Sequence, residues 1–592
     1  MTRTPCACPL CAALANASNT DAPANPSLGK AISGDYRIDA LLESASSRWN
    51  ASGPLGSAVE VTYSFMTAAP SYGGTDSDGA TGFQPFTAAQ KAAARGILVQ
   101  LSTMLNISFR EVADSETHYG QIRFGNNVQQ ESSGYAFLPD PENSDIAGDV
   151  WISLEYSNEQ APGSYSYATL LHEIGHALGL KHPGNYNAGE ETDPDSDATY
   201  LGQAEDNQHY TVMSYSDAGY SEGQQRTWYG KYDMLALQYL YGSRNVNNGD
   251  ANTYSYSDIS GRDLVLIQDS AGTQDTIDLS GLTAGAAVDL REGGFSSVGK
   301  GPSGQAAVAN LSIMYGTVIE NLIATPGADT ITGNAASNRI TSGGGADTID
   351  GGSGTDTVVL GGNWSAWRLS SSGSQVSVNK SGSTVSLTNV ERVQFADMTV
   401  NLQAGAAARE LSATELKSIV ELYIAYFNRI PDADGLSYWA GQLKDGQTVT
   451  QIGESFYAAA VQYASLTGYS ADMGNADFVR VIYKNVLGRS EASAPPDEDV
   501  NYWAGEIAAA RATRGTLIST MLDSAHSFKG HATWGWVADL LDNKVSVANY
   551  FAVDNGLNYN TAEDSISKGM AIAAAVTATG TDAAIQLIGV AA

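Results

Sequence analysis

The chain has 592 residues, and its 31 Lys and Arg against 64 Asp and Glu give a formal net charge of −33. A surface this acidic repels phosphates, which argues against nucleic acid or an anionic membrane surface as the main partner. Hydrophobic residues make up 43% and charged residues 16% of the chain, so several folded domains are expected rather than wholesale disorder. No apolar run reaches the roughly 18 residues of a spanning helix, and we expect no membrane span.

Residues 1–30 are expected to form an N-terminal tail or pro-segment. They are rich in Ala, Asn, Pro and Ser without periodicity, and they fit a secretory signal peptide poorly. All three cysteines lie here, at Cys6, Cys8 and Cys11, so the remaining chain has no possible disulfide. The folded body is therefore expected to rely on hydrophobic cores and metal ions.

Residues 31–242 mix helical and strand patterns. Phe86–Met104 is Ala-rich with apolar residues at helical spacing, and Thr87 is its expected N-cap. Two further helices are expected over residues 165–180 and 231–240. Short apolar or alternating segments predict strands at Val59–Phe65, Ser108–Val112, Gln121–Phe124 and Asp149–Leu154.

The most informative stretch is HEIGHALGLKHP, which begins at His172. His176 is four positions further along the expected helix, so the two imidazoles lie on one face and can share one Zn²⁺. Gly179 lets the chain leave the helix, and His182 can return as a third ligand. Glu173 can contact water on the metal rather than the metal itself. The alternative, two core histidines beside an incidental glutamate, does not account for five residues in this pattern.

Residues 243–403 are rich in Gly, Ser, Thr, Asp and Val, which predicts β-structure with many turns. Within this region a nine-residue register places polar residues at Asp329, Asn338, Asp347 and Asp356, each followed two positions later by Ile or Val. This is the RTX nonapeptide pattern of a parallel β-roll whose turns bind Ca²⁺. Two nonapeptides make one coil, so Asp329 should stack on Asp347 and Asn338 on Asp356. The alternative, a Gly/Asp-rich linker, leaves the strict period unexplained.

Several structural Ca²⁺ ions are expected in these turns, because stacked carboxylates repel one another unless a hard cation lies between them. The segment GTQDTIDLSG at residues 272–281 is a looser relative of the repeat. The residues expected at the calcium sites are Gly327, Asp329, Asn338, Gly343, Gly345, Asp347, Gly352, Gly354 and Asp356.

Residues 404–592 are Ala-rich and are expected to be all-α. YWAG at residues 438–441 recurs at 502–505, which indicates an internal duplication. Trp439 and Trp503 occupy matching positions and are expected to be core residues, with stacking on sugars as the alternative.

The zinc motif resembles that of the metzincin proteases, and among them the serralysin family of secreted bacterial endopeptidases. HEIGHALGLKHPGNYNAGE at 172–190 and TVMSYS at 211–216 look like the family's zinc motif and Met-turn. The resemblance continues through KYDMLALQYLYG at 231–242 and covers roughly residues 30–360. Asn185 stands where many relatives have Asp, which touches no catalytic position.

This resemblance implies the site and its chemistry. One catalytic Zn²⁺ would activate water, Glu173 would transfer its proton, and Met213 would form the floor of the site. Tyr215 would be a further zinc ligand that can leave the metal and donate to the oxyanion. The segment with Gly148, Asp149, Val150 and Trp151 would be the edge strand along which substrate adds, although any edge strand has the same pattern. The implied protein ligands of zinc are His172, His176, His182 and Tyr215.

The expected fold is multidomain: an α+β metzincin catalytic domain, a parallel RTX β-roll domain and an all-α C-terminal domain. The expected function is a secreted, calcium-stabilised zinc endopeptidase acting on proteins or peptides. The alternative is a surface-binding or structural RTX protein with a vestigial protease domain. The expected segments are the pro-segment 1–30, the protease 31–242, the β-roll 243–403 and the duplicated helical region 404–592.

Export and assembly are also expected from the resemblance. A type I secretion machine would read an uncleaved C-terminal signal, although the ending AIQLIGVAA lacks the acidic-hydrophobic pattern of many relatives. The helical region is a candidate for cell-surface docking, and a monomer is expected. The N-terminal cysteines are read as a disposable tail, or alternatively as a thiolate cap that keeps a zymogen latent.

Overall fold

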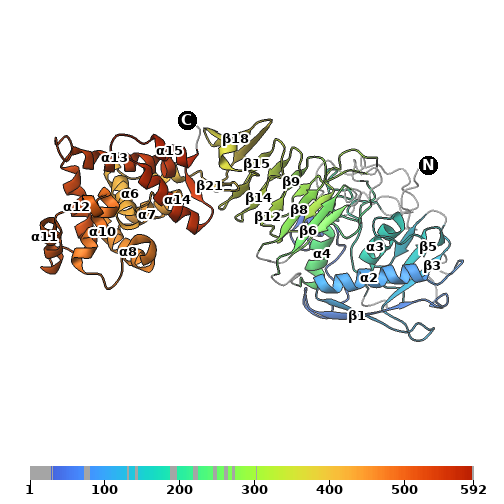
Figure 1. The fold of residues 1–592 in the computed structure, drawn as a ribbon. Coiled ribbons are helices and arrows are strands. Elements are labelled where there is room, and N and C mark those ends of the chain that lie inside the picture. Colours follow the sequence, from blue (N-terminus) through green and yellow to red (C-terminus); the bar gives the residue numbers. More distant parts are fainter. Residues whose placement is uncertain are drawn as a thin grey trace. The chain divides into compact units, whose positions relative to one another are not determined.

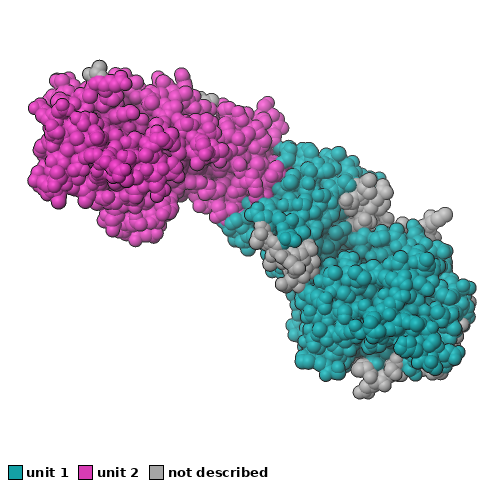
Figure 2. All heavy atoms as spheres, turned by 60° about the horizontal axis from the view of Figure 1, so that its bottom comes forward, with its two compact units in different colours: residues 1–338, 343–354 teal, residues 339–342, 355–592 magenta. Residues whose placement is uncertain are grey.

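The computed structural model describes residue 29 and residues 31–72, 81–129, 132–140, 145–186, 197–217, 225–244, 250–258, 264–269, 274–301 and 303–589. The three cysteines lie outside these residues. The chain forms two compact units, residues 1–338 with 343–354 and residues 339–342 with 355–592, which Figure 2 colours separately. Within the described ranges, every helix is too short or too polar to cross a membrane.

A five-stranded sheet organises the N-terminal part of the first unit. Its order is β2-β1-β3-β5-β4, with β4 antiparallel to β5 and the other neighbours parallel. Four of its strands match the predicted segments to within a few residues. The strands are β1 (Val59–Phe65), β2 (Ile107–Glu111), β3 (Ile122–Asn127), β4 (Gly134–Ala136) and β5 (Val150–Ser153).

The predicted edge strand is wrong in its position. β5 contains Val150 and Trp151, and it lies between β3 and β4. β4 pairs Tyr135 with Trp151, so β4 takes the outer edge that the sequence assigned to residues 148–153. Only three residues form β4, too few to show the alternation by which a strand is found in sequence.

Helices α2 (Ala88–Met104) and α3 (Tyr165–Ala177) pack beside this sheet in Figure 1 and complete one hydrophobic core. The predicted N-cap Thr87 is confirmed: its hydroxyl accepts from Gln90 N, and Gln90 Oε1 accepts from Thr87 N. Ile97, Leu101 and Ile174 are buried in the core between helices and strands. The helices of this part are α1 (Tyr36–Asp39), α2 (Ala88–Met104), the short η2 (Leu154–Tyr156), α3 (Tyr165–Ala177) and α4 (Lys231–Tyr241).

Two short strands near the end of the first unit repeat at the 18-residue offset of two nonapeptides. β13 (Thr330–Thr332) and β15 (Thr348–Asp350) pair in parallel with Thr330 opposite Thr348, and Asp329 N donates to Asp347 Oδ1 at 3.0 Å. The predicted stacking of Asp329 on Asp347 is therefore confirmed. The other strands here are β6 (Thr253–Ser257), β7 (Val265–Ile267), β8 (Thr276–Gly281), β9 (Ala287–Asp289), β10 (Phe295–Ser296), β11 (Leu311–Ile313) and β12 (Asn321–Ile323).

The second unit begins with strands of the same period. β14 (Arg339–Thr341) pairs in parallel with β16 (Thr357–Val359), and Arg339 lies opposite Thr357, again two nonapeptides apart. Ile340 and Val358 are fully buried between the strands. The remaining elements are η4 (Trp364–Ala366), β17 (Arg368–Ser372), β18 (Gln375–Lys380), β19 (Ser383–Thr388), β20 (Arg392–Gln394) and β21 (Met398–Asn401).

The C-terminal region is helical but not all-α, which corrects the sequence prediction. β22 (Leu557–Tyr559) follows most of its helices and pairs antiparallel with β21, with Val400 opposite Leu557. Three residues are again too few for a periodic pattern, and their partner strand lies far away in the sequence. The helical segment between β21 and β22 is thus joined to the β-structure at both of its ends.

The internal duplication appears as two sets of three helices, α6-α7-α8 and α10-α11-α12, in the orange to red part of Figure 1. YWAG lies on α7 in the first set and on α11 in the second. The helices are α5 (Ala404–Arg409), α6 (Ala413–Phe427), α7 (Ala433–Lys444), α8 (Val449–Gln462), α9 (Ala464–Thr467), α10 (Asn475–Leu487), η5 (Glu491–Ser493), α11 (Asp497–Ala508), α12 (Arg514–His526), α13 (Gly535–Asn549), the π-helix η6 (Tyr550–Asp554), α14 (Ala562–Ala575) and α15 (Asp582–Ile588).

Candidate metal centre

Three histidines meet at the C-terminal end of α3. His172 and His176 lie one turn apart on the helix, and His182 reaches them from the segment that follows. His182 Nε2 is 3.2 Å from His172 Nε2 and 3.1 Å from His176 Nε2. All three side chains are buried. The predicted triad is therefore brought together, with its Nε2 atoms directed at one point.

The sharp exit from α3 makes this convergence possible. The helix ends at Ala177, three residues before the predicted end, and Gly179 follows with a φ of +105°. A Cβ at Gly179 would lie 2.2 Å from Ser47 O, so only glycine fits. The turn brings Leu180 O to 2.7 Å from His176 Nδ1.

Backbone carbonyls fix the tautomers of the two helical histidines. His172 Nδ1 lies 2.8 Å from Val212 O, and His176 Nδ1 contacts Leu180 O, so each Nδ1 carries the proton and each Nε2 presents a lone pair. Burial lowers the pKa of His172 to about 4 and that of His176 to about 3, which keeps both rings neutral at neutral pH. Together with the imidazole of His182, these two nitrogens fit a catalytic Zn²⁺ with an open fourth position.

Glu173 is fully buried beside the triad. Neither of its carboxylate oxygens has a hydrogen-bond partner among the described residues, and burial raises the pKa of Glu173 well above its usual range. Strand β4 crosses directly above it: a Cβ at Gly134 would lie 3.0 Å from Glu173 Oε1. A buried carboxylate without a partner requires one, and a water molecule or a substrate proton can supply it.

Tyr215 and Met213 also lie close to the histidine triad. Tyr215 Oη is 2.7 Å from His182 Nε2, and the two ring centroids are 4.5 Å apart. Met213 is fully buried, and a Cβ at Gly175 would lie 2.8 Å from Met213 Sδ. The methionine therefore lies against the helix between the two histidines, in the position expected for the floor of the site.

Asp233 is a functional residue that the sequence analysis missed. This fully buried carboxylate on α4 accepts hydrogen bonds from Val212 N at 2.8 Å and Gly230 N at 2.7 Å, and also from the Thr211 hydroxyl. It thereby holds the segment whose Val212 carbonyl orients His172. The signal available in sequence was one acidic residue in the apolar stretch KYDMLALQYLYG.

Asp206 anchors the tyrosine side of the centre in a similar way and was also missed. It is buried and accepts from Tyr186 Oη and Ser214 Oγ, both at 2.6 Å. The ring of Tyr186 lies 4.9 Å from that of Tyr215. Ser214 and Tyr215 are thus held by one carboxylate network, which no local sequence pattern reveals.

Asp149 belongs to a buried network and not to an exposed strand edge. It accepts a hydrogen bond from Tyr72 Oη at 2.5 Å, and Arg123 Nη1 donates to the same hydroxyl at 2.8 Å. Burial raises the pKa of Asp149 well above its usual range. Its neighbour Gly148 has a φ of +79° and closely approaches Trp49. These two residues stabilise the start of β5.

The predicted calcium residues occupy tight turns between the short strands. The carboxylate of Asp329 accepts from Ala286 N at 2.7 Å and Thr325 N at 3.1 Å, and burial raises its pKa. A Cβ at Gly327 would lie 2.4 Å from Gly285 N, where two turns approach closely. The glycines with a left-handed φ are Gly343, Gly345, Gly352 and Gly354.

Comparisons with known proteins relate the chain to one peptidase family. Residues 236–428 match the model "Peptidase M10 serralysin C terminal", and residues 464–530 match a domain of unknown function, DUF4214. Serralysin G of Dickeya chrysanthemi is 34% identical over 315 residues, 49% of this chain and 62% of its own length. Serralysin of Proteus mirabilis is 35% identical over 325 residues, 49% of this chain and 63% of its own.

Metallopeptidase AprA of Pseudomonas marginalis is 35% identical over 305 residues, 47% of this chain and 61% of its own length. The chain thus spans about three fifths of the length of these relatives. Among solved structures, myroilysin aligns with 35% of this chain at 19% identity and a TM-score of 0.21, a likeness too weak to support a conclusion. The family model and the curated relatives bear out the resemblance predicted from the sequence: over about half of its length, the chain is similar to serralysins.

Proposed function

We propose that the chain is a secreted zinc endopeptidase that hydrolyses peptide bonds of proteins. The observation that carries this proposal is the convergence of three imidazole Nε2 atoms beside Glu173, whose two carboxylate oxygens have no hydrogen-bond partner among the described residues. An intact ligand set and base disfavour the rival function, a structural RTX protein with a vestigial protease domain. Chelator-sensitive cleavage of casein tests the choice between the two.

The proposed reaction uses Glu173 as the proton carrier. When bound by the triad, Zn²⁺ would polarise the scissile carbonyl and lower the pKa of water to about 7. Glu173 accepts the proton of the attacking water and delivers it to the leaving amine. Its buried position excludes bulk water, so the proton is retained until the amine leaves.

The proposed substrate strand is β4, in place of residues 148–153. β4 pairs on one side with β5, and its other edge ends the sheet among the described strands. An extended peptide that adds to this edge forms main-chain hydrogen bonds and so binds with broad sequence tolerance. Gly134 brings this edge close to Glu173, because any side chain there would collide with the carboxylate.

Replacing Tyr215 by phenylalanine is expected to lower kcat for casein by about 10²-fold, the cost of losing one donor to a tetrahedral oxyanion. The ring contacts with His182 and Tyr186 do not need the hydroxyl, so zinc content and unfolding temperature should change little. Steady-state kinetics with metal analysis measures both quantities. Tyr119→Phe is the matched control, and unaltered kcat in Tyr215→Phe would exclude this role.

We further propose that Asp329 and Asp347 bind structural Ca²⁺. The resemblance to RTX proteins supports this assignment, and so does the stacking of the two residues. Millimolar Ca²⁺ is expected to raise the unfolding temperature, because an ion that binds only the folded state stabilises it. Asp347→Asn should reduce this rise, whereas the exposed control Asp250→Asn should not. Differential scanning calorimetry with and without EGTA measures the shift. A Ca²⁺-independent unfolding temperature would contradict the assignment.

Export and organisation complete the proposal. By resemblance, a type I secretion machine would carry the chain, and calcium outside the cell would fold the repeats after passage. We propose residues 31–242 as the protease, 243–403 as the RTX region and 404–592 as the duplicated helical region, after a pro-segment. Zymogen latency through the cysteines, which lie outside the described residues, and surface docking by the helical region are further parts of the proposal.

A further inference from the structure

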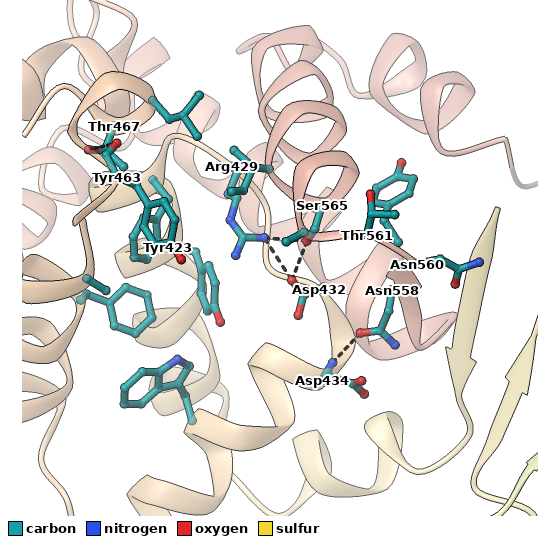
Figure 3. A pocket seen from close by; sticks show the side chains of 18 residues that line it. Tyr423, Arg429, Asp432, Asp434, Tyr463, Thr467, Asn558, Asn560, Thr561 and Ser565 are labelled. Carbon is teal, nitrogen blue, oxygen red and sulfur yellow. Dashed lines mark hydrogen bonds and ion pairs between the residues drawn. The ribbon is translucent and has the colours of Figure 1, made fainter. Parts of the chain in front are cut away.

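A cavity of about 470 Å³ lies in the second unit, between the first helical repeat and the segment β22–α14. Figure 3 shows Tyr423, Tyr463 and Thr467 on one side and Asn558, Thr561 and Ser565 on the other. Its size and its mixture of aromatic and polar walls are those of a small-molecule site. None of these residues belongs to the proposed protease site.

One wall of the cavity is aromatic and is built around Phe456. The centroid of this ring lies 5.0 Å from Trp439, 4.8 Å from Tyr423 and 5.3 Å from Phe427. Trp439 is only partly buried, and Tyr463, 52% exposed, lies on the same side. Half-exposed rings beside a cavity provide flat apolar faces on which a ligand can stack.

The polar centre of the cavity is held rigidly. Asp432 accepts from Arg429 Nη1 at 3.1 Å and Ser565 Oγ at 2.8 Å, and its other oxygen caps α7 at Gly435 N. Figure 3 shows Arg429, Asp432 and Ser565 joined in this network. Nε and Nη2 of Arg429 have no hydrogen-bond partner in the part of the chain that the structure describes. They are donors available to a ligand.

The second helical repeat provides an internal comparison. Arg489 lies over Tyr483 at 5.6 Å as Arg429 lies over Tyr423 at 5.2 Å. However, Arg489 Nε and Nη2 donate to the carbonyls of Ser493 and Ala494. At equivalent repeat positions, Arg489 thus donates its Nε and Nη2 hydrogen bonds to backbone carbonyls, whereas Nε and Nη2 of Arg429 remain available to a ligand.

The repeats also differ at the cap of their second helix. Asp432 caps α7, whereas Pro496 precedes α11 and provides no side-chain cap. The wall formed by β22 and α14 contacts the first copy through Ser565. The polar centre is therefore specific to the first copy and is not required by the repeat fold itself.

The charges of the cavity select a neutral ligand. Each acid on its wall is paired with an arginine: Asp432 with Arg429 and Asp434 with Arg392. An anion would face Asp432 and Asp434, and a cation would face Arg429, so either would disturb a balanced pair. A purely apolar ligand would leave the donors of Arg429 unsatisfied. A neutral ring with hydroxyl groups on its edge and C–H groups on its face satisfies both walls.

We propose that this cavity is a binding site for neutral saccharides, with a sugar ring stacked on the aromatic wall of Trp439 and Tyr463 and hydroxyls bonded to Arg429. The site is independent of the proposed proteolysis and would attach the enzyme to glycan-bearing surfaces. It revises the sequence interpretation of Trp439 as a core residue.

Saturation-transfer NMR on the full chain tests this proposal, with maltose, cellobiose, lactose and diacetylchitobiose as neutral probes and choline and glucuronate as charged probes. At least one neutral disaccharide is expected to bind. Trp439→Ala and Tyr463→Ala are expected to weaken that binding by at least about tenfold, as the loss of an aromatic anchor does. The exposed Tyr463 keeps the test valid if Trp439→Ala destabilises the helices.

The matched control is Trp503→Ala, because Trp503 has the same repeat position and the same edge contact with a preceding tyrosine, 5.0 Å against 4.9 Å. Binding should be unchanged in this variant. The proposal is overturned if none of the four disaccharides binds, if only choline or glucuronate binds, or if Trp503→Ala weakens binding as much as Trp439→Ala does.

Discussion

Replacing Glu173 by glutamine is expected to lower kcat for casein by about 10²–10⁴-fold, the contribution of a positioned acid–base group. The amide has nearly the shape of the carboxylate but cannot accept the water proton. The fold should be retained, because both carboxylate oxygens lack hydrogen-bond partners among the described residues. Unfolding temperature should even rise, since a buried carboxylate without a partner is destabilising.

The control for this prediction is Glu155→Gln, an exposed glutamate on the short helix after β5. Zinc content measured by atomic emission must stay near one per chain in both variants, so that the loss reports proton transfer rather than metal loss. Metal-replete Glu173→Gln that cleaves casein at the wild-type rate would refute the assigned base.

Replacing His176 by alanine is expected to abolish both zinc binding and casein cleavage. Loss of a group that only orients a ligand costs about 10–100-fold in metal affinity, and loss of a direct ligand should cost more. His176 Nε2 is one of only three imidazole nitrogens at the site, so two would remain. Equilibrium dialysis with zinc and a cleavage assay of the same sample measure the two losses together.

His118→Ala is the matched control, since His118 is exposed and its backbone, not its ring, makes its hydrogen bonds. It should retain zinc and full activity. Stoichiometric zinc in His176→Ala at wild-type affinity would show that the metal is held elsewhere.

Local patterns predicted the parts of the site that local chemistry determines. His172, Glu173 and His176 follow from helical spacing alone, and the turn at Gly179 follows from the need for a positive φ. The nine-residue period likewise located the apolar position of each repeat, and Ile331 and Ile349 at this position are both buried. In each case the determining interaction lies within a few residues or within one exact repeat.

The features that could not be predicted from the sequence depend on contacts between residues far apart in the chain. β4 and β22 have three residues each, and their identity as strands comes from pairing with β5 and β21. The contrast between Arg429 and Arg489 is invisible in sequence, because both arginines follow the same repeat pattern. Only the folded chain shows that one has its donors occupied by carbonyls and the other does not.

Because β22 pairs with β21, the helices between these two strands are an insertion within a sheet and not a separate domain on a flexible linker. The helices between these strands form one large loop, and closing it carries an entropic cost that grows only slowly with loop length. Such a long-range contact forms late, after the helices have folded locally. Until then the edge of β21 is open to pairing with other chains. Truncation before Leu557 should therefore promote aggregation, even though it leaves every nonapeptide intact.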